Sequence, residues 1–173
     1  KKNKKFNIGK YYQLKKEVKK LPDIIINLSG QLDYKKKMFN TILNGNKNII
    51  KIVKELDRSI LIVYLSSALV YGYSNNNNKE NSKKKPITVY SKIKSRAEDQ
   101  YLKSNLNYLI LRVCNIYDNF EKDKGILGKI YRSLKNNTKM KITNQNAHRN
   151  YISLNDLCSA ICKILKNNKF KSK

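Results

Sequence analysis

The sequence predicts an α/β fold in which a parallel sheet is flanked by helices. Three short apolar runs rich in β-branched residues carry this prediction, at residues 24–28, 60–65 and 108–113. Each run is apolar at successive positions rather than alternate ones, which is typical of a strand covered on both faces. Segments with helical spacing alternate with these runs, as in a parallel sheet. No internal repeat appears, so we expect a single compact unit.

The helices are placed by their apolar spacing and by the residues at their ends. Pro22 ends the first helical pattern, and Pro86 closes a polar segment at residues 75–85. After that segment Thr88 or Ser91 can cap a helix, because a hydroxyl can accept a free backbone N–H there. The expected helices cover residues 11–21, 34–56, 88–104 and 125–134 and a segment after Asn155, with a short strand at 140–142.

The chain is strongly basic, with 38 Lys and Arg residues against 12 Asp and Glu and a formal net charge of +26. Such an excess often marks a nucleic-acid partner, because cations that neutralise phosphates dominate that affinity. Here nearly all of it is lysine, spread through every segment among Asn and Ile, as A/T-rich codon usage produces. We expect salt-sensitive, non-specific attraction to polyanions and no specific nucleic-acid partner. A basic nucleic-acid-binding domain is the weaker alternative, because arginine clusters and a recognised binding motif are absent.

Other residue classes limit the chemistry further. The three cysteines, Cys114, Cys158 and Cys162, form no metal-ligand pattern, and we expect the last two to be small buried hydrophobes on one helix. One histidine, His148, excludes a histidine-rich metal site, so we expect no metal. No apolar run approaches the roughly 20 residues of a membrane span, and no signal peptide opens the sequence. We therefore expect a cytoplasmic protein without a membrane partner.

The catalytic signal combines a serine at a strand end with a tyrosine and a lysine on a helix. Tyr90 and Lys94 are four residues apart and so share a helix face. A nearby ammonium lowers the pKa of a phenol from its reference value of about 10, which lets the phenol exchange a proton with a substrate hydroxyl. Ser67 follows the second strand, and ligands of open α/β sheets bind at that end. The Tyr/Lys spacing alone is weak evidence among 12 tyrosines, whereas the joint pattern is specific.

These segments resemble the extended short-chain dehydrogenase/reductase superfamily, in its NAD-dependent epimerase/dehydratase group, over nearly the whole chain. The resemblance implies a Rossmann-like sheet. Residues 22–30 are similar to the family's fourth strand, and residues 66–72 to its active-site serine strand. Tyr90 and Lys94 match its catalytic pair, and Asn115 matches an asparagine of its substrate site. Residues 148–157 are similar to its Arg-Asp-Tyr-Ile segment. Glu98 falls at a common acidic position of the same helix.

The resemblance also implies roles. Ser67, Tyr90 and Lys94 would be catalytic, with Tyr90 as the general base in hydride transfer at a sugar carbon. NAD or NADP would be the cofactor, and the substrate would be a nucleotide sugar. Asn115 would contact the sugar nucleotide, and Arg149 would clamp its diphosphate. The cofactor would be held by Leu28, Ser29, Gly30, Ser66, Tyr90 and Lys94.

Two positions narrow the reaction. Dehydratases of this group usually carry Asp-Glu directly after the active-site hydroxyl residue, where this chain has Ala68 and Leu69. The resemblance therefore implies an NAD(P)-dependent nucleotide-sugar epimerase or reductase. Smaller departures from the family pattern are Asn46, Gln145 and Asn150.

The family's first strand and its glycine-rich turn have no counterpart among the six glycines. On this basis we expect an N-terminally truncated chain that lacks the first βαβ unit. We expect residues 1–120 to form a partial Rossmann-like catalytic portion and residues 121–173 a small substrate-binding portion. Strand 24–28 would then present an apolar edge. The alternative is a non-catalytic fragment or pairing half that binds a separate N-terminal half. The resemblance also implies a possible homodimer, because family members commonly dimerise through the two helices that correspond to residues 35–56 and 88–104 here.

Overall fold

A computed structural model describes residues 22–30, 40–73, 77–121, 125–141 and 148–167. The chain divides into two compact units, which we describe separately: residues 1–112 with the last two residues, and residues 113–171. The helix predicted at 11–21 and residues 34–39 of the next one lie outside the described residues. The division of function between residues 1–120 and 121–173 stays a prediction.

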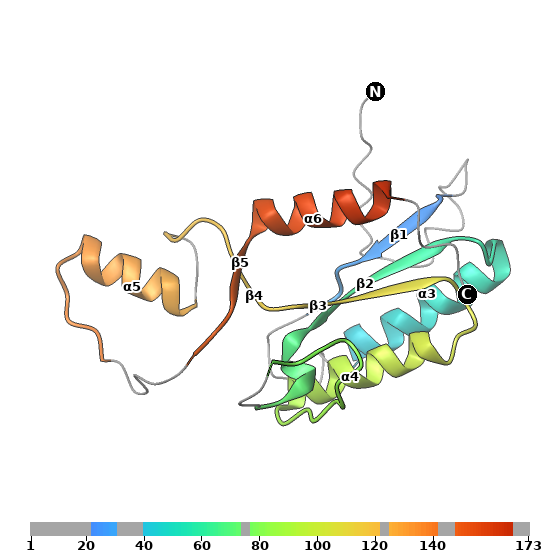
Figure 1. Cartoon of the computed structure of the whole chain (residues 1–173), viewed down its shortest axis with the longest axis horizontal. Helices are drawn as coiled ribbons and strands as arrows, with labels where there is room; N and C mark the ends of the chain where they lie inside the picture. The colour runs from blue at the N-terminus through green and yellow to red at the C-terminus, as the bar shows by residue number, and fades with distance from the viewer. Residues whose placement is uncertain (1–21, 31–39, 74–76, 122–124, 142–147, 168–173) are drawn as a thin grey trace. The chain divides into compact units, whose positions relative to one another are not determined.

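The first unit is built on a three-stranded sheet with the order β1-β2-β3 (Figure 1). Its strands are β1 (Ile24–Asn27), β2 (Leu61–Ser67) and β3 (Tyr108–Val113). β1 pairs in parallel with β2, in a register that runs from Ile24 opposite Leu61 to Asn27 opposite Tyr64. All three strands were predicted, and the expected α/β, Rossmann-like class is confirmed.

β1 differs from the prediction of a strand buried on both faces. Its residues alternate, with Ile25 and Asn27 buried while Ile24 and Ile26 are 36% and 40% exposed. The prediction of two covered faces is wrong for this strand, because the described residues cover only one of them. β1 is also an edge strand of the described sheet, as expected.

Two helices cover the face of the sheet on which Ile25 and Asn27 of β1 are buried (Figure 1). A π-helical turn, η2 (Asn40–Asn44), leads into α3 (Gly45–Leu56), so the expected continuous helix begins with a wider turn. α4 (Val89–Leu102) starts after Thr88, whose hydroxyl accepts the Ser91 N–H at 3.1 Å, which confirms Thr88 as the cap. The core between helices and sheet consists of Ile25, Ile42, Leu43, Ile49, Val53, Ile60, Ile62, Tyr64, Ile93, Ala97, Tyr101 and Leu106.

The second unit contains a strand pair that the sequence patterns did not predict. β4 (Asn115–Tyr117) pairs in parallel with β5 (Tyr151–Ser153). The helices are α5 (Ile126–Lys135) and α6 (Leu154–Lys166). Residues 140 and 141 are not in a strand, contrary to the prediction at 140–142, and Ile142 is outside the described residues.

Two predictions about α6 are wrong: the residue that caps it and the burial of its cysteines. The Ser153 hydroxyl accepts the Asp156 N–H at 3.0 Å, so Ser153 is the cap and Asn155 lies inside the helix. Cys158 and Cys162 are both exposed rather than buried. The four-residue spacing places them on one face of α6, but that face is not the one that packs around Leu157.

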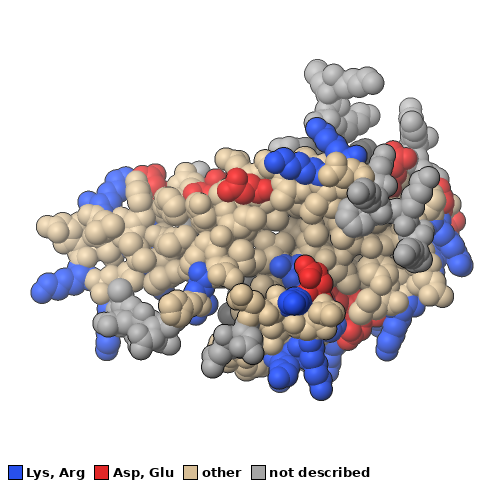
Figure 2. All heavy atoms as spheres, in the orientation of Figure 1, with Lys and Arg blue, Asp and Glu red and all other residues tan. Residues whose placement is uncertain are grey.

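The basic side chains are dispersed over the face shown in Figure 2, where lysines and arginines are separated by uncharged surface and lie beside acidic residues at several places. Across the described ranges, no helix combines the length and apolar character needed to cross a bilayer. Nor do the residues described bring three His, Cys, Asp or Glu side chains together as a metal site would need.

Candidate active site

Lys94 occupies the carboxyl end of the sheet in the first unit. Its side chain comes from α4, and the residue is only 3% exposed. The Nζ donates to the carbonyl oxygens of Ser29 at 2.9 Å and Leu65 at 2.7 Å. It also lies 4.7 Å from the centroid of the Tyr64 ring. The ammonium therefore contacts the segments that follow or end both β1 and β2.

The chain after β1 passes this ammonium at Gly30, a residue without a side chain. A Cβ at Gly30 would lie 3.4 Å from the Lys94 Nζ, so the glycine adds no side chain in contact with the ammonium. The Ser29 hydroxyl is buried and has no hydrogen-bond partner among the described residues. Two of the three ammonium hydrogens are used on carbonyls, so one hydrogen of Lys94 is left to donate.

Tyr90 precedes Lys94 by one turn of α4 and is half-buried. The Lys94 Nζ lies 5.9 Å from its ring centroid. Burial raises the pKa of Tyr90, so the expected lowering by Lys94 does not appear in this structure. The reason is that burial removes water from the phenol itself and so disfavours the tyrosinate. Burial also lowers the pKa of Lys94 to about 8, partly opposed by the charge of Glu98.

The two serines at the end of β2 have different partners. The Ser67 hydroxyl accepts the Leu69 N–H at 3.2 Å and keeps its own hydrogen available as a donor. The Ser66 hydroxyl donates to Glu98 Oε1 at 2.5 Å. The contact of Ser66 with a cofactor therefore stays a prediction, and its hydroxyl is already engaged on α4.

A buried ion pair beside these serines was not predicted from the sequence. Glu98 is fully buried, and Arg112 donates to both of its carboxylate oxygens, with the Nη2 at 2.9 Å from Oε2 and the Nε at 3.1 Å from Oε1. Arg112 also donates to the Tyr71 hydroxyl at 2.7 Å. An arginine within the apolar run of β3 was the available signal, because such a charge needs a buried partner.

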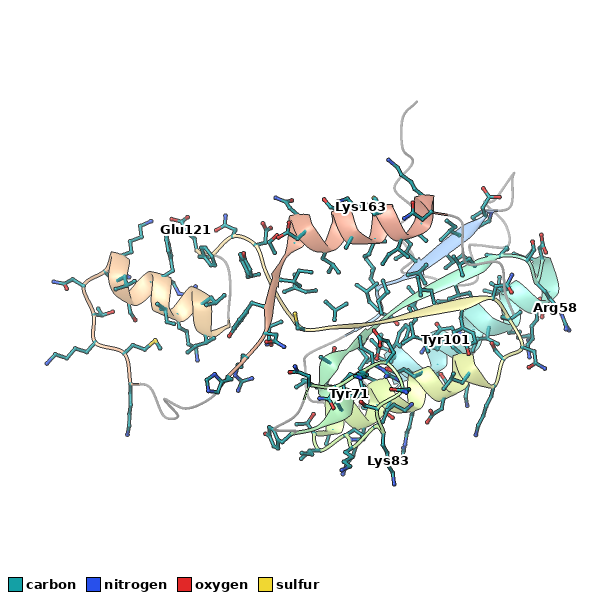
Figure 3. All side chains as sticks on the ribbon, in the orientation of Figure 1. Arg58, Tyr71, Lys83, Tyr101, Glu121 and Lys163 are labelled. Carbon is teal, nitrogen blue, oxygen red and sulfur yellow. The ribbon has the colours of Figure 1, made fainter. Side chains whose placement is uncertain are left out.

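A second buried polar cluster fixes the chain where it leaves β1. The Asn27 Nδ2 donates to Asn46 Oδ1 and to the Tyr101 hydroxyl, both at 2.7 Å. The Asn27 Oδ1 accepts the Ser29 N–H at 2.9 Å. Tyr101 lies between α4 and the sheet (Figure 3). The signal in the sequence was an asparagine ending an otherwise apolar strand.

The remaining predicted site residues are not brought together with the triad by the described contacts. Leu28 is 64% exposed. Asn115 and Arg149 belong to the second unit, where the Asn115 Nδ2 donates to the Asn150 carbonyl at 3.0 Å and Arg149 is exposed. Their contacts with a nucleotide sugar stay predictions.

The sequence is similar to a known protein family and to one of its curated members. The model of the NAD dependent epimerase/dehydratase family matches residues 3–173. The chain belongs to this family. A curated epimerase/dehydratase relative, the ADP-L-glycero-D-manno-heptose-6-epimerase of Brachyspira hyodysenteriae, is 33% identical over 127 residues, which cover 65% of this chain and 39% of that protein.

Solved structures with lower identity share the fold of this epimerase/dehydratase chain. RMD from Pseudomonas aeruginosa, complexed with NADPH, has a TM-score of 0.76 and 21% identity over 91% of this chain and 59% of that one. The dTDP-glucose 4,6-dehydratase of Bacillus anthracis, in complex with NAD, has a TM-score of 0.74 and 20% identity over 86% and 49%. The chain thus spans about two fifths to three fifths of the length of these relatives.

Proposed function

We propose that this chain carries the catalytic portion of an NAD(P)-dependent nucleotide-sugar epimerase or reductase. The supporting observation is the position of Lys94, which contacts the carboxyl ends of β1 and β2 one turn from Tyr90. Ser67 ends the same strand that Lys94 contacts. The apolar pair Ala68–Leu69 favours epimerase or reductase chemistry over dehydration, which would need carboxylates there.

The residues present fit the nicotinamide end of a dinucleotide. Lys94 has one ammonium hydrogen to donate, the Ser29 hydroxyl has no described partner, and Gly30 adds no side chain beside the ammonium. These groups suit the hydroxyls of a ribose. Bound there, NAD or NADP would accept a hydride from a sugar carbon or return one to it. The structures of two relatives hold NAD or NADPH, which supports the same cofactor class here.

Tyr90 and Ser67 would handle the proton of the reacting sugar oxygen. Ser67 would donate its hydroxyl hydrogen to that oxygen. Because burial raises the pKa of Tyr90, the phenol holds its proton at neutral pH and donates more readily than it accepts. Acting as the general base therefore needs support from the Lys94 cation, which favours the tyrosinate.

Further parts of the proposal concern substrate and partners. The relative from Brachyspira is named for an ADP-linked heptose, and we propose a nucleotide sugar as the substrate class, with Asn115 and Arg149 as its contacts. A homodimer would use α3 and α4, whose exposed residues include Lys47, Lys51 and Lys92. Pairing with a separate N-terminal half is the alternative partner. The cytoplasmic location also stays a prediction.

Ligand-observed NMR with nicotinamide mononucleotide, NAD and NADP tests the cofactor site and detects weak binding. The mononucleotide carries only the part that these residues would contact. We expect Lys94→Met to abolish its saturation-transfer signal and Lys92→Met, an exposed lysine of the same helix, to leave it unchanged. The absence of any signal for all three nucleotides would refute the cofactor assignment.

Turnover is tested separately with a panel of nucleotide sugars that includes ADP-heptoses, with the products followed by NMR. Tyr90→Phe should slow conversion by about 10²-fold or more, the usual contribution of a general acid or base. The matched control is Tyr73→Phe, because Tyr73 is 85% exposed. Equal rates for Tyr90→Phe and the control would show that the mechanism is wrong.

A further inference from the structure

Among the described residues of the first unit, Glu98 is the most buried charged group that the proposed chemistry does not use. It is fully buried, and a carboxylate in that position is costly unless charged or polar groups surround it. Three elements supply such groups: Ser66 from β2, Arg112 from β3, and Lys84 from the segment before α4, with its Nζ 3.3 Å from Oε2. One side chain thus joins the elements around the site.

The contacts of Glu98 and Lys94 fall on consecutive residues of β2. Lys94 donates to the Leu65 carbonyl at 2.7 Å, and Glu98 accepts from the Ser66 hydroxyl at 2.5 Å. Both side chains come from one face of α4, four residues apart. The next residue of the strand is Ser67. The position of Ser67 relative to α4 therefore depends on both contacts.

Arg112 extends the same arrangement beyond β2. Besides Glu98 it contacts the Tyr71 hydroxyl at 2.7 Å and the Glu80 carbonyl at 2.9 Å, and its guanidinium lies 4.8 Å from the Tyr71 ring centroid. Tyr71 ends the 3-10 turn η3 (Ala68–Tyr71), which directly follows Ser67. Glu98 and Arg112 thus hold the residues on both sides of Ser67.

The charges near Lys94 give Glu98 a second effect. Lys94 faces the rings of Tyr64 on β2 and Tyr90 on α4 and two carbonyl oxygens, none of which is a formal negative charge. Glu98 is the acidic group that opposes the effect of burial on the pKa of Lys94. The cations that contact Glu98 are Arg112 and Lys84, and Lys84 also pairs with Asp99.

We propose that Glu98 is a positioning residue of this site: its buried carboxylate fixes the end of β2 against α4 and places a negative charge one helical turn from Lys94. The inference rests on the proposed function, because the site it serves is the Ser67, Tyr90 and Lys94 site. It acts through Ser66 and Lys94 and contacts no substrate itself.

The test is a pH titration of the Lys94 side chain by NMR in lysine-labelled protein, with its signal identified by its loss in Lys94→Met. Glu98→Gln keeps an acceptor for Ser66 and removes the charge, which also leaves Arg112 uncompensated. Loss of this negative charge disfavours the ammonium, so the pKa of Lys94 should fall by about one pH unit from its value near 8. An unchanged pKa in Glu98→Gln would overturn the proposal.

Asp99→Asn is the matched control, because it removes one carboxylate from the adjacent residue, which also pairs with Lys84. Its effect on the pKa of Lys94 should be less than about a third of that of Glu98→Gln, because an exposed charge is screened by solvent. Glu98→Asp keeps the negative charge, so the pKa of Lys94 in this variant should be close to its wild-type value. Equal shifts in Asp99→Asn and Glu98→Gln would also overturn the proposal.

Glu98→Gln could fail to fold, because it leaves Arg112 without its carboxylate. The titration is then made on Arg112→Met with and without Glu98→Gln, a pair that differs only in the charge of Glu98, and the same fall in pKa is expected. The wild-type titration with nicotinamide mononucleotide decides the proposed function separately. A fall in the Lys94 pKa without nucleotide binding would support the role of Glu98 toward Lys94 and refute the cofactor site.

Discussion

Gly72 stands at a position where a side chain should destabilise the first unit. Its backbone has φ 75° and ψ −155°, a combination that side chains strongly disfavour. A Cβ there would overlap the carbonyl oxygen of Lys85 and lie 3.2 Å from its carbonyl carbon. Since both neighbours are backbone atoms, a rotamer change cannot relieve the overlap.

The cost of Gly72→Ala follows from two terms. A non-glycine residue in such a backbone region costs about 1–3 kcal/mol. Displacing Lys85 also weakens the hydrogen bond from its N–H to the Val70 carbonyl, which is 2.9 Å long, at about 1 kcal/mol. We expect the free energy of unfolding to fall by about 2–4 kcal/mol.

Urea unfolding followed by circular dichroism measures this change, with Gly30→Ala as the matched control. At Gly30 the φ angle is not in the left-handed region, and the nearest atom to a new Cβ is the Lys94 Nζ at 3.4 Å. That variant should lose less than about 0.5 kcal/mol. A Gly72→Ala variant as stable as Gly30→Ala would show that the segment at Lys85 moves freely and would refute the reasoning.

Two further predictions concern buried polar groups. Tyr101→Phe removes the hydroxyl that accepts from Asn27, so the free energy of unfolding measured in urea should fall by about 1–3 kcal/mol. Tyr108→Phe is the control and should have little effect, because Tyr108 is at the more exposed end of β3. The pKa of Lys94 is about 8 when folded, below its ordinary value of 10.5, so the folded state releases this proton first as the pH rises. Stability relative to Lys94→Met should therefore increase by about 1–2 kcal/mol from pH 8 to 9.5, and a difference that stays constant over this range would contradict the burial of a charged Lys94.

The strands and the helix at Thr88 were predictable because their signals are local. Successive β-branched residues identified β2, and a threonine after a proline identified the start of α4. The pattern for β1 predicted the strand but not its exposure, because Ile24 and Ile26 look the same whether or not another layer covers them. Exposure depends on what packs against a strand, which its own residues do not encode.

The second unit was harder to predict for a related reason. β4 and β5 have only three residues each, too few for a clear period, and they pair across more than thirty positions of sequence. The cysteines of α6 show the same limit, because small residues fit both faces of a helix. Local signals did identify its helices: the helix predicted at 125–134 matches α5, and the start of α6 was assigned two residues too late.

The candidate site divides in the same way. Ser67, Tyr90 and Lys94 were identified from spacing, since four residues place two side chains on one helix face. The link from Glu98 to Arg112 joins a helix to a strand and depends on tertiary packing. The direction of the Tyr90 pKa was missed because spacing reports the neighbouring cation and not the loss of water, which is the larger effect here.

The two carbonyl contacts of Lys94 tie the site to the pairing of the strands. The ladder between β1 and β2 ends at Asn27 and Tyr64, and the carbonyls of Ser29 and Leu65 lie just past that end. Beyond the end of the ladder, the Lys94 ammonium donates to one carbonyl from each strand's chain and so links the two chains there. A slip of one residue in this pairing would move one carbonyl by about 3.3 Å and reverse the direction in which it points. The register of a strand pair thus sets whether the lysine can hold its position.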